Sequence, residues 1–385
     1  MRANIISMLK YLIISVLLIS FWGCNKNTNN VNNPPGNKVK LHYAKGFSIT
    51  QYEGYKVVSV FNPWQNSSEK KVDYYLYPDS AELNNSTPDC RKIQIPVKRV
   101  VVFSATHVAF IQLIEQTQSI VAASGAQYIY NKIIKQKMQS GTFPEIGYEQ
   151  SINYELLLTL KPDVVFVFSV SEGNVSYIDK MEQLGIPVVY VAEYLEEHPL
   201  GKAEWCKMIA SFYDMEPIAA QKFDSIQFLY NQLKDSCLSL SPKPKIVLNL
   251  PYNGIWYLPG GESYMAQIIA DAGGDYLWKN IQGRESFPVS YEEIYAKGIN
   301  ADIWLHPGTV TSVSSIKQTD SRLTAFKSIK KFQVYNNIAK TDISGGNEFW
   351  ETGTVNPYLI LSDLASIFYP EKFKKTNYNL YVRLQ

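Results

Sequence analysis

Two runs of short apolar strands, each alternating with helical segments, are separated by a long stretch without any strand signal. The first run predicts strands at Arg99–Phe103, Ile120–Ala123, Asp163–Phe168 and Pro187–Val191. The second run predicts strands at Lys245–Leu250, Ile255–Tyr257, Ala301–His306 and Phe332–Tyr335. Continuous apolar strands separated by helices are typical of parallel sheets covered on both faces. The sequence therefore predicts an α/β fold with two α/β lobes, at residues 97–198 and 243–385.

The stretch between the two runs, residues 199–242, has a helical pattern that is broken once near Asp214. Pro217 is suitably placed to begin a second helix, because proline is favoured in the first turn. An uninterrupted helix of some 20 residues spans about 30 Å. We therefore expect one long rigid helix to join the lobes.

The two lobes resemble each other in one respect. Glu155 precedes Asp163 and its strand, and Glu292 precedes Asp302 and its strand, each from a short helix. Such self-similarity favours two related lobes that face a common ligand cleft. For both glutamates a solvated helix face is the alternative. Ser290 and Glu293 form a capping-box pattern, which predicts that Glu293 is satisfied at the start of its own helix.

The N-terminus reads as a lipoprotein signal at residues 1–24. Arg2 and Lys10 flank a short basic segment at the start of the chain. The apolar run Tyr11–Phe21 that follows is too short to span a bilayer, and Gly23 precedes Cys24. Cys24 is therefore the predicted lipidation site, with a soluble secreted protein as the alternative. The Asn-rich residues 25–40 predict a flexible tether. Alternating residues at 41–96 predict a small N-terminal β-rich addition.

Composition excludes some functions. The formal net charge is only +2, and the sequence has no long run of charges of one sign. Nucleic acid is therefore not an expected partner. Aromatic residues make up 13% of the chain, which suits a large planar or glycan-like ligand, although core filling accounts for most aromatic residues. Besides Cys24, the spacing of Cys90, Cys206 and Cys237 leaves one bridge with a free thiol or three buried thiols open.

No phosphate-binding loop, HExxH or GxSxG motif occurs, so the chain is not expected to be an enzyme. His107 follows the first strand of the first lobe and His306 ends a strand of the second, so both are candidates for the cleft, where they could hold a metal or haem iron. The alternative is that each caps a strand end. A metal-dependent periplasmic enzyme would need a third ligand, for which Glu193 is the candidate.

Several segments together resemble the iron-siderophore and cobalamin substrate-binding proteins of ABC transporters, over residues 97–372. The segments are Arg99–His107, Glu155–Phe168, His198–Trp205, Ala272–Trp278, Glu292–Leu305 and Gly346–Trp350. Members of that family have two lobes joined by one long helix. The resemblance implies that Glu155 and Glu292 dock onto arginines of the membrane permease.

The resemblance also implies the function. The expected protein is a monomeric lipoprotein on the periplasmic side of the cell membrane that captures an iron(III)-siderophore-type chelate and delivers it to an inner-membrane ABC permease. Corrinoid or haem is the alternative ligand, and no resident cofactor or metal is expected. The candidate ligand-binding residues are Thr106, His107, Tyr128, Tyr148, Trp256, Tyr257, Arg284, Phe287, His306 and Trp350.

Overall fold

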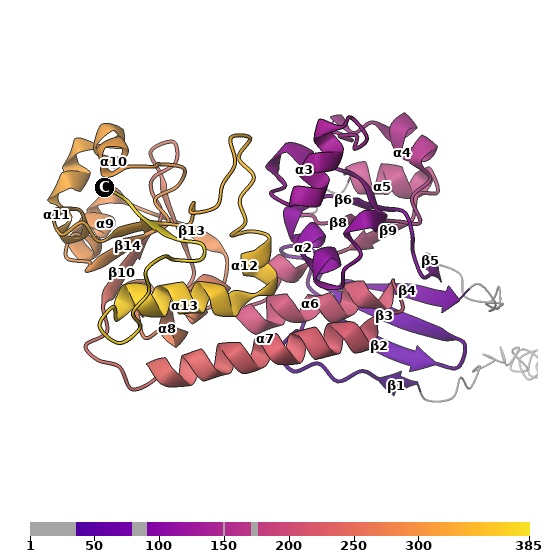
Figure 1. Ribbon diagram of the computed structural model, residues 1–385, viewed down its shortest axis with the longest axis horizontal. Coiled ribbons are helices and arrows are strands. Elements are labelled where there is room, and N and C mark those ends of the chain that lie inside the picture. Colours follow the sequence, from indigo (N-terminus) through magenta and orange to yellow (C-terminus); the bar gives the residue numbers. More distant parts are fainter. Residues whose placement is uncertain (1–35, 79–90, 149–150, 171–175) are drawn as a thin grey trace, which may run out of the picture. The chain divides into compact units, whose positions relative to one another are not determined.

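The computed structural model describes residues 36–78, 91–148, 151–170 and 176–385 (Figure 1). The predicted signal, the lipidation site Cys24, most of the tether and Cys90 lie outside the described residues. Residues 37–385 form one compact unit. In the described part of the chain, no helix combines the length and the apolar character needed to cross a membrane.

A five-stranded sheet begins the described chain, in the order β1-β2-β3-β4-β5. Its strands are β1 (Asn37–Lys38), β2 (Phe47–Tyr52), β3 (Tyr55–Phe61), β4 (Lys71–Pro78) and β5 (Arg91–Ile95). Neighbouring strands are antiparallel, except that β4 and β5 run parallel. The turn between β2 and β3 needs Gly54, whose φ of +81° is accessible mainly to glycine. Apolar residues on one face are buried, as the alternating pattern predicts.

The N-lobe is built on a four-stranded parallel sheet in the order β7-β6-β8-β9. The strands are β6 (Val100–Val102), β7 (Ile120–Ala123), β8 (Val164–Val167) and β9 (Val188–Tyr190). All four coincide with predicted strands, because a strand covered on both faces is apolar throughout. The helices are α2 (Ala105–Leu113), α3 (Lys132–Gln139), α4 (Tyr154–Leu160) and α5 (Ser176–Gln183), with η1 (Thr117–Ser119), η2 (Ala126–Tyr128) and η5 (Glu193–Leu195).

Two helices follow the N-lobe, α6 (Pro199–Ser211) and α7 (Glu216–Cys237). They are separated at Asp214, whose φ is +57°, and Pro217 lies in the first turn of α7, as predicted. The 22 residues of α7 correspond to a length of about 33 Å. This helix packs on α6 and on α13 of the following lobe, so it contacts both halves of the molecule.

The C-lobe is built on a sheet in the order β12-β10-β14-β15-β16. Its strands are β10 (Lys245–Leu248), β12 (Asp275–Tyr276), β14 (Ile303–Leu305), β15 (Val334–Asn336) and β16 (Val382–Arg383), of which only β16 is antiparallel to its neighbour. The predicted strand at residues 255–257 lies elsewhere. As β11 (Trp256–Pro259), it pairs with β13 (Ser286–Val289) in a separate antiparallel hairpin. The helices are α8 (Tyr264–Asp271), α9 (Tyr291–Gly298), α10 (Val313–Thr319), η6 (Ser321–Ala325), α11 (Lys327–Lys330), α12 (Thr352–Val355) and α13 (Pro357–Phe368).

A buried carboxylate on α6 fixes the N-terminal sheet to the body of the protein. The Glu204 carboxylate accepts three successive backbone N–H groups, those of His42, Tyr43 and Ala44, at 3.0, 2.8 and 2.9 Å. Lys207 supplies the positive charge at 2.7 Å. Burial raises the pKa of Glu204, but these hydrogen bonds outweigh burial and lower it overall. The carboxylate is therefore held ionised against the segment that leads into β2.

A second glutamate extends this attachment. Glu196 lies just before α6 and accepts the backbone N–H groups of Lys45 and Gly46 at 3.0 and 2.8 Å. Its third donor is the indole N–H of Trp205, at 2.9 Å. Residues 42–46 therefore give their backbone donors to two carboxylates instead of to a strand.

Two of the thiols can be placed. Cys206 on α6 and Cys237 at the end of α7 are both buried and free, so they do not form a bridge with each other. Burial raises the pKa of Cys206 to about 12 and that of Cys237 to about 11. Both therefore remain protonated at neutral pH and behave as small apolar side chains.

Replacing Glu204 with alanine should lower the free energy of unfolding by about 3–5 kcal/mol, because Lys207 and three backbone donors would lose their acceptor. Urea unfolding at pH 7 measures this. Since the folded pKa is lowered, the contribution is present above the ordinary pKa of a glutamate and is lost as pH falls through the lowered value. The exposed Glu155→Gln variant is the control, expected within about 0.5 kcal/mol of wild type. Equal effects of the two variants would contradict the attachment.

Candidate functional site

The carboxyl ends of the N-lobe strands place polar residues on one edge of the sheet. Ser104 follows β6 and caps α2 by accepting the N–H of Thr106 at 3.2 Å. The Thr106 hydroxyl lies 2.9 Å from the Ser104 hydroxyl and also bonds to Glu193, which follows β9. Parallel sheets commonly bind ligands at this edge. The predicted site residue Thr106 is therefore held at the expected edge of the sheet.

His107, one residue further along α2, points the other way. Its side chain is 0% exposed, with its ring against Phe166 and Phe168. Within the described part of the chain, neither ring nitrogen has a hydrogen-bond partner. Desolvation lowers the pKa of His107 to about 3, so the ring is neutral. The prediction of a ligand-facing His107 is not supported by this placement, because the helix directs this position into the lobe's core.

His306 is tied to aromatic residues of the C-lobe. Its Nε2 lies 2.6 Å from the Tyr381 hydroxyl, and its ring stacks on Tyr381 and meets Phe349 edge-on. Desolvation lowers the pKa of His306 to about 3. No group of three or more His, Cys, Asp or Glu side chains suited to a metal ion occurs among the described residues. The geometry therefore gives no support to a metal-dependent enzyme built on the two histidines.

Trp256 is a predicted ligand-binding residue, but the structure buries it. It is 0% exposed, its indole N–H donates to the Leu248 carbonyl at 2.9 Å, and its ring stacks on Trp304 and Phe326. This residue is part of the C-lobe core. Its neighbour Tyr257 points to the other face of the hairpin and is exposed, while Phe287 on the paired strand is half-buried.

Tyr128 and Tyr148 form an exposed aromatic pair on the N-lobe. Their ring centroids lie 6.5 Å apart in an edge-to-face arrangement. A segment of the C-lobe lies against this pair. A Cβ on Gly345 would come within 3.3 Å of the Tyr128 ring. The two predicted tyrosines are therefore brought to a place where the lobes meet.

Two polar contacts fix the lobes to each other near this pair. The ammonium group of Lys135 on α3 lies 2.7 Å from an Asp342 carboxylate oxygen in the C-lobe. Glu351, which is buried, accepts the backbone N–H of Tyr130 in the N-lobe. Burial raises the pKa of Glu351 to about 8. Sequence reasoning missed Glu351, whose only signal is its position directly after Trp350.

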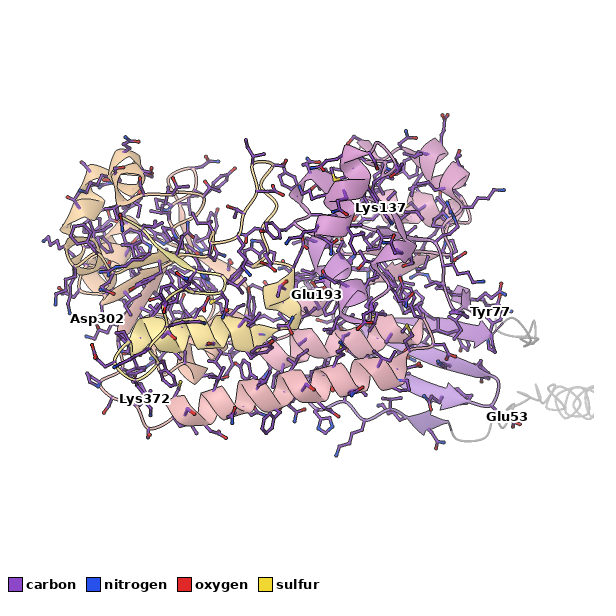
Figure 2. All side chains as sticks on the ribbon, in the orientation of Figure 1. Glu53, Tyr77, Lys137, Glu193, Asp302 and Lys372 are labelled. Atoms are coloured by element: carbon purple, nitrogen blue, oxygen red, sulfur yellow. The ribbon has the colours of Figure 1, made fainter. Side chains whose placement is uncertain are left out.

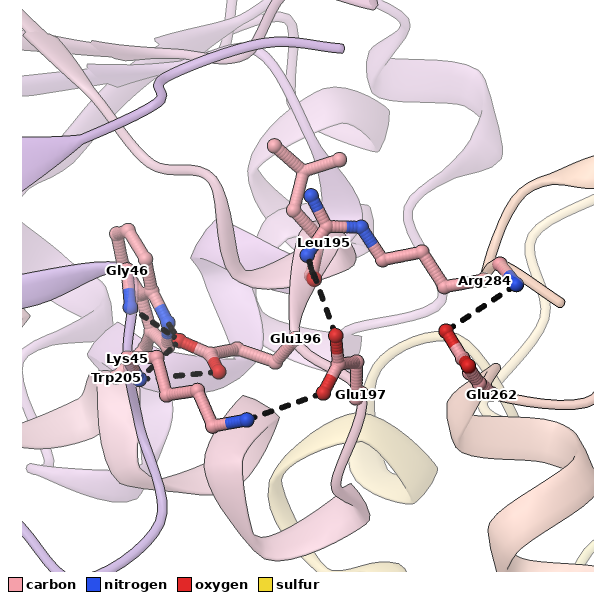
Figure 3. Close-up of polar contacts among 9 residues, drawn as sticks. Lys45, Gly46, Leu195, Glu196, Glu197, Trp205, Glu262 and Arg284 are labelled. Carbon is pink, nitrogen blue, oxygen red and sulfur yellow. Dashed lines mark hydrogen bonds and ion pairs between the residues drawn. The ribbon is translucent and has the colours of Figure 1, made fainter. Parts of the chain in front are cut away.

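Arg284 makes another contact between the lobes (Figure 3). Its guanidinium donates to the Leu195 carbonyl at 2.7 Å and lies 4.0 Å from a Glu197 oxygen. The second oxygen of Glu197 is 3.1 Å from the ammonium group of Lys45. Arg284 therefore joins the C-lobe to the N-lobe at a point where the N-terminal sheet is also attached.

Trp350 is 46% exposed and precedes α12, which packs on α2 and α6. It lines a cavity of about 10 Å³ together with Lys202 of α6 and Tyr264 of α8. Lys202 and Glu193 are both buried, and Figure 2 labels Glu193. The sequence identified Glu193 only as a metal-ligand candidate and did not identify Lys202.

Glu155 and Glu292 occupy matching positions, in the first turns of α4 and α9. Both are exposed, and neither has an ion-pair partner among the residues that the structure describes. The hydrogen bonds of Glu293 differ from those that the sequence predicts. Its backbone N–H donates to Ser290 as expected, but its carboxylate accepts from the Trp278 indole at 2.8 Å and from Lys297 at 2.9 Å.

Residues 100–337, more than half of the chain, match the model of the family described as periplasmic binding protein. An uncharacterized lipoprotein of Methanocaldococcus jannaschii is 29% identical over 92% of this chain and 89% of its own length. Fewer residues lie outside that alignment than make up residues 37–95, so the alignment includes part of the segment that holds the N-terminal sheet.

Solved structures share the fold. A periplasmic heme binding protein from Pseudomonas aeruginosa gives a TM-score of 0.56 at 15% identity, covering 75% of this chain and 98% of that one. An ABC-type Fe3+-hydroxamate transport system protein from Saccharomonospora viridis gives 0.54 at 15% identity, covering 71% and 93%.

Ionisation of Glu351 should lower the stability of the folded protein as pH rises toward about 8, because the charge that forms is buried. The folded protein binds more protons than the unfolded chain between the ordinary pKa of a glutamate and this raised value, so stability falls as pH rises across that window. Lys135 and Glu348 are the charged groups that also act on Glu351. Urea unfolding from pH 5 to 9 should show wild type losing stability relative to Glu351→Gln. Parallel pH profiles would refute the effect.

Proposed function

Because the chain belongs to the periplasmic binding protein family, we propose that it is the substrate-binding lipoprotein of an ABC importer. Its cargo is an iron(III)-siderophore-type chelate, which it delivers to the inner-membrane permease. The family and the structural neighbours are solute-binding proteins and not enzymes. The observation that carries the proposal is that predicted ligand-binding residues lie at contacts between the lobes: Tyr128 lies against Gly345, and Arg284 bonds the Leu195 carbonyl.

The aromatic residues suit a large ligand with apolar faces, because rings provide broad contact area at little cost in conformational entropy. Arg284 adds a positive charge, which favours the oxygen-rich and often anionic surface of a ferric chelate. Thr106, Phe287 and the neutral ring of His306 complete the proposed lining. The Fe3+-hydroxamate neighbour supports the siderophore class. Haem, which the Pseudomonas neighbour binds by its description, and corrinoid remain the alternatives.

We place the protein on the periplasmic side of the cell membrane, held by lipid on Cys24. The lipoprotein relative supports this placement. The Asn-rich residues after Cys24 would then act as the tether to the folded unit that begins at Asn37. A flexible tether keeps the binding protein near a permease in the same membrane.

Glu155 and Glu292 are the proposed permease contacts. Each is an exposed carboxylate in the first turn of a helix, one on each lobe. Paired charges of this kind mainly set orientation and association rate. One carboxylate per lobe would let a permease sense the relation between the lobes.

A soluble form of residues 25–385 should bind a chelate with a Kd below about 10 μM, near −7 kcal/mol. The buried core lies within residues 47–384, so this form keeps it. Absorbance titrations with ferrichrome, cyanocobalamin and hemin distinguish the three ligand classes. Trp350→Ala should weaken binding about 2- to 10-fold, as expected for one aromatic contact.

The matched control is Phe228→Ala, which removes an exposed ring from α7 and should leave affinity unchanged. Absence of binding by all three probes would remove the main support for the import function. Equal losses from both variants would argue against a site at Trp350.

Reversing the charge at Glu155 and Glu292 together, by Glu155→Lys and Glu292→Lys, should slow association with the solubilised permease about 10-fold or more at low salt. Ligand affinity should not change, because both residues lie on exposed helix turns. Glu371→Lys, an exposed charge reversal elsewhere in the C-lobe, is the control. Surface plasmon resonance at two salt concentrations measures the rates. Unchanged association of the double variant would exclude this docking mode.

A further inference from the structure

A loop of the C-lobe reaches across to the N-lobe beside the proposed ligand site. Residues 341–347 form this loop, the clasp, which lies between β15 and α12. Its two ends are joined by an antiparallel bridge between Thr341 and Asn347. Figure 1 shows the chain that leads into α12 passing between the two lobes.

Two contacts hold the clasp on the N-lobe. The ammonium group of Lys135, on α3, lies 2.7 Å from Asp342 Oδ2. Gly345 lies against the Tyr128 ring of η2, which a Cβ on this glycine would approach within 3.3 Å. The clasp therefore covers part of a tyrosine that belongs to the proposed ligand lining.

The clasp keeps its own shape without the N-lobe. Asp342 Oδ1 accepts the backbone N–H groups of Ser344 and Gly346, each at 2.9 Å. The backbone N–H of Asp342 donates to the Gly346 carbonyl at 2.9 Å. One oxygen of Asp342 thus shapes the loop while the other faces Lys135. Loss of the contact with Lys135 would leave the loop folded.

The tip of the clasp is held weakly. The side chains of Lys135 and Asp342 are 21% and 25% exposed, and Oδ2 makes no hydrogen bond of good geometry with any described residue. Partly exposed ion pairs contribute little to stability. Ile343 at the tip is fully exposed, so its apolar side chain adds no burial to the closed state. Loops with so little buried apolar contact open most readily.

The base of the clasp is fixed more firmly than its tip. Glu351 is buried there and accepts the backbone N–H of Tyr130 in the N-lobe. The adjoining α12 packs on α2 and α6. Arg284 joins the lobes at a separate place. The tip can therefore leave the N-lobe while the lobes stay joined.

We propose that the clasp is a gate, whose tip moves off Tyr128 to let cargo pass and returns once the cargo is bound. This inference rests on the proposed function and concerns how the same site is reached. The ion pair between Lys135 and Asp342 sets how often the gate opens. A gate acts on passage in both directions, so it changes the association and dissociation rates together and leaves Kd nearly unchanged.

A distance measurement without ligand tests the movement directly. Nitroxide labels on Ile343→Cys at the tip and on Lys180→Cys, an exposed position of α5, report their separation by electron paramagnetic resonance. The protein is the form of residues 25–385 with Cys90→Ser. Its remaining native thiols, Cys206 and Cys237, are buried and protonated, so they do not react with the label.

Asp342→Asn is the main variant, because it removes the charge that faces Lys135 and keeps an oxygen for the loop. The share of molecules with a displaced tip should rise about 2- to 5-fold, as expected from loss of a partly exposed ion pair. Lys135→Gln should act alike, although it also loses a hydrogen bond to the Gln127 carbonyl. The double variant should exceed neither single one by much, because both remove the same pair.

Stopped-flow mixing measures passage of cargo, with whichever of ferrichrome, cyanocobalamin and hemin binds. Asp342→Asn should raise the association and dissociation rate constants each about 2- to 5-fold, with Kd within about 2-fold of wild type. The matched control is Lys297→Gln, which breaks an ion pair with Glu293 inside the C-lobe. Neither the label separation nor the rates should change in this control.

The outcomes distinguish this inference from the proposed function. Label separations and rates that stay unchanged in both clasp variants overturn the gate and give the loop a fixed structural role. A change in only one of the two rate constants also overturns it, because a gate acts in both directions. Absence of binding by every probe refutes the proposed function, and the label separations alone then decide whether the clasp opens.

Discussion

The buried carboxylates of Glu196 and Glu204 fix the N-terminal sheet to the rest of the molecule. Each collects successive backbone N–H groups from residues 42–46, which belong to no strand, and thereby replaces the hydrogen bonds that a sheet would give. Because both glutamates sit at or just before α6, the N-terminal sheet is fixed to the element that connects the lobes. The contact of Lys45 with Glu197, and of Glu197 with Arg284, follows from that attachment.

The carboxylate of Glu193, which follows β9, is paired less completely than these two. Carboxylates that are surrounded by donors are held in place, as Glu204 and Asp363 are. Glu193 sits at an equivalent depth but keeps an oxygen without a partner. Its position at the carboxyl end of a parallel strand is where α/β proteins bind ligands.

Much of the fold could be predicted, because apolar strands and helix starts leave local patterns. Residues 100–102, 164–167 and 303–305 are strands as expected. The pairing of β11 with β13 in a separate hairpin was not predicted. Its partner β13 lies some thirty positions later in the sequence, and no local pattern encodes that pairing. Trp256 and Trp350 look alike in sequence, yet only the second reaches the surface. Glu351 escaped prediction because its partner is a backbone N–H from the other lobe.

The attachment of residues 42–46 also decides how mechanical load would pass through the protein. A pull applied at the N-terminal end of the folded unit first reaches β1 and β2 and then the carboxylate contacts on α6. The strands of the two lobes do not continue this path of force through backbone pairing, because they pair only within their own sheets. Tension on the chain would thus be passed to α6 before it reaches the sheets of the lobes.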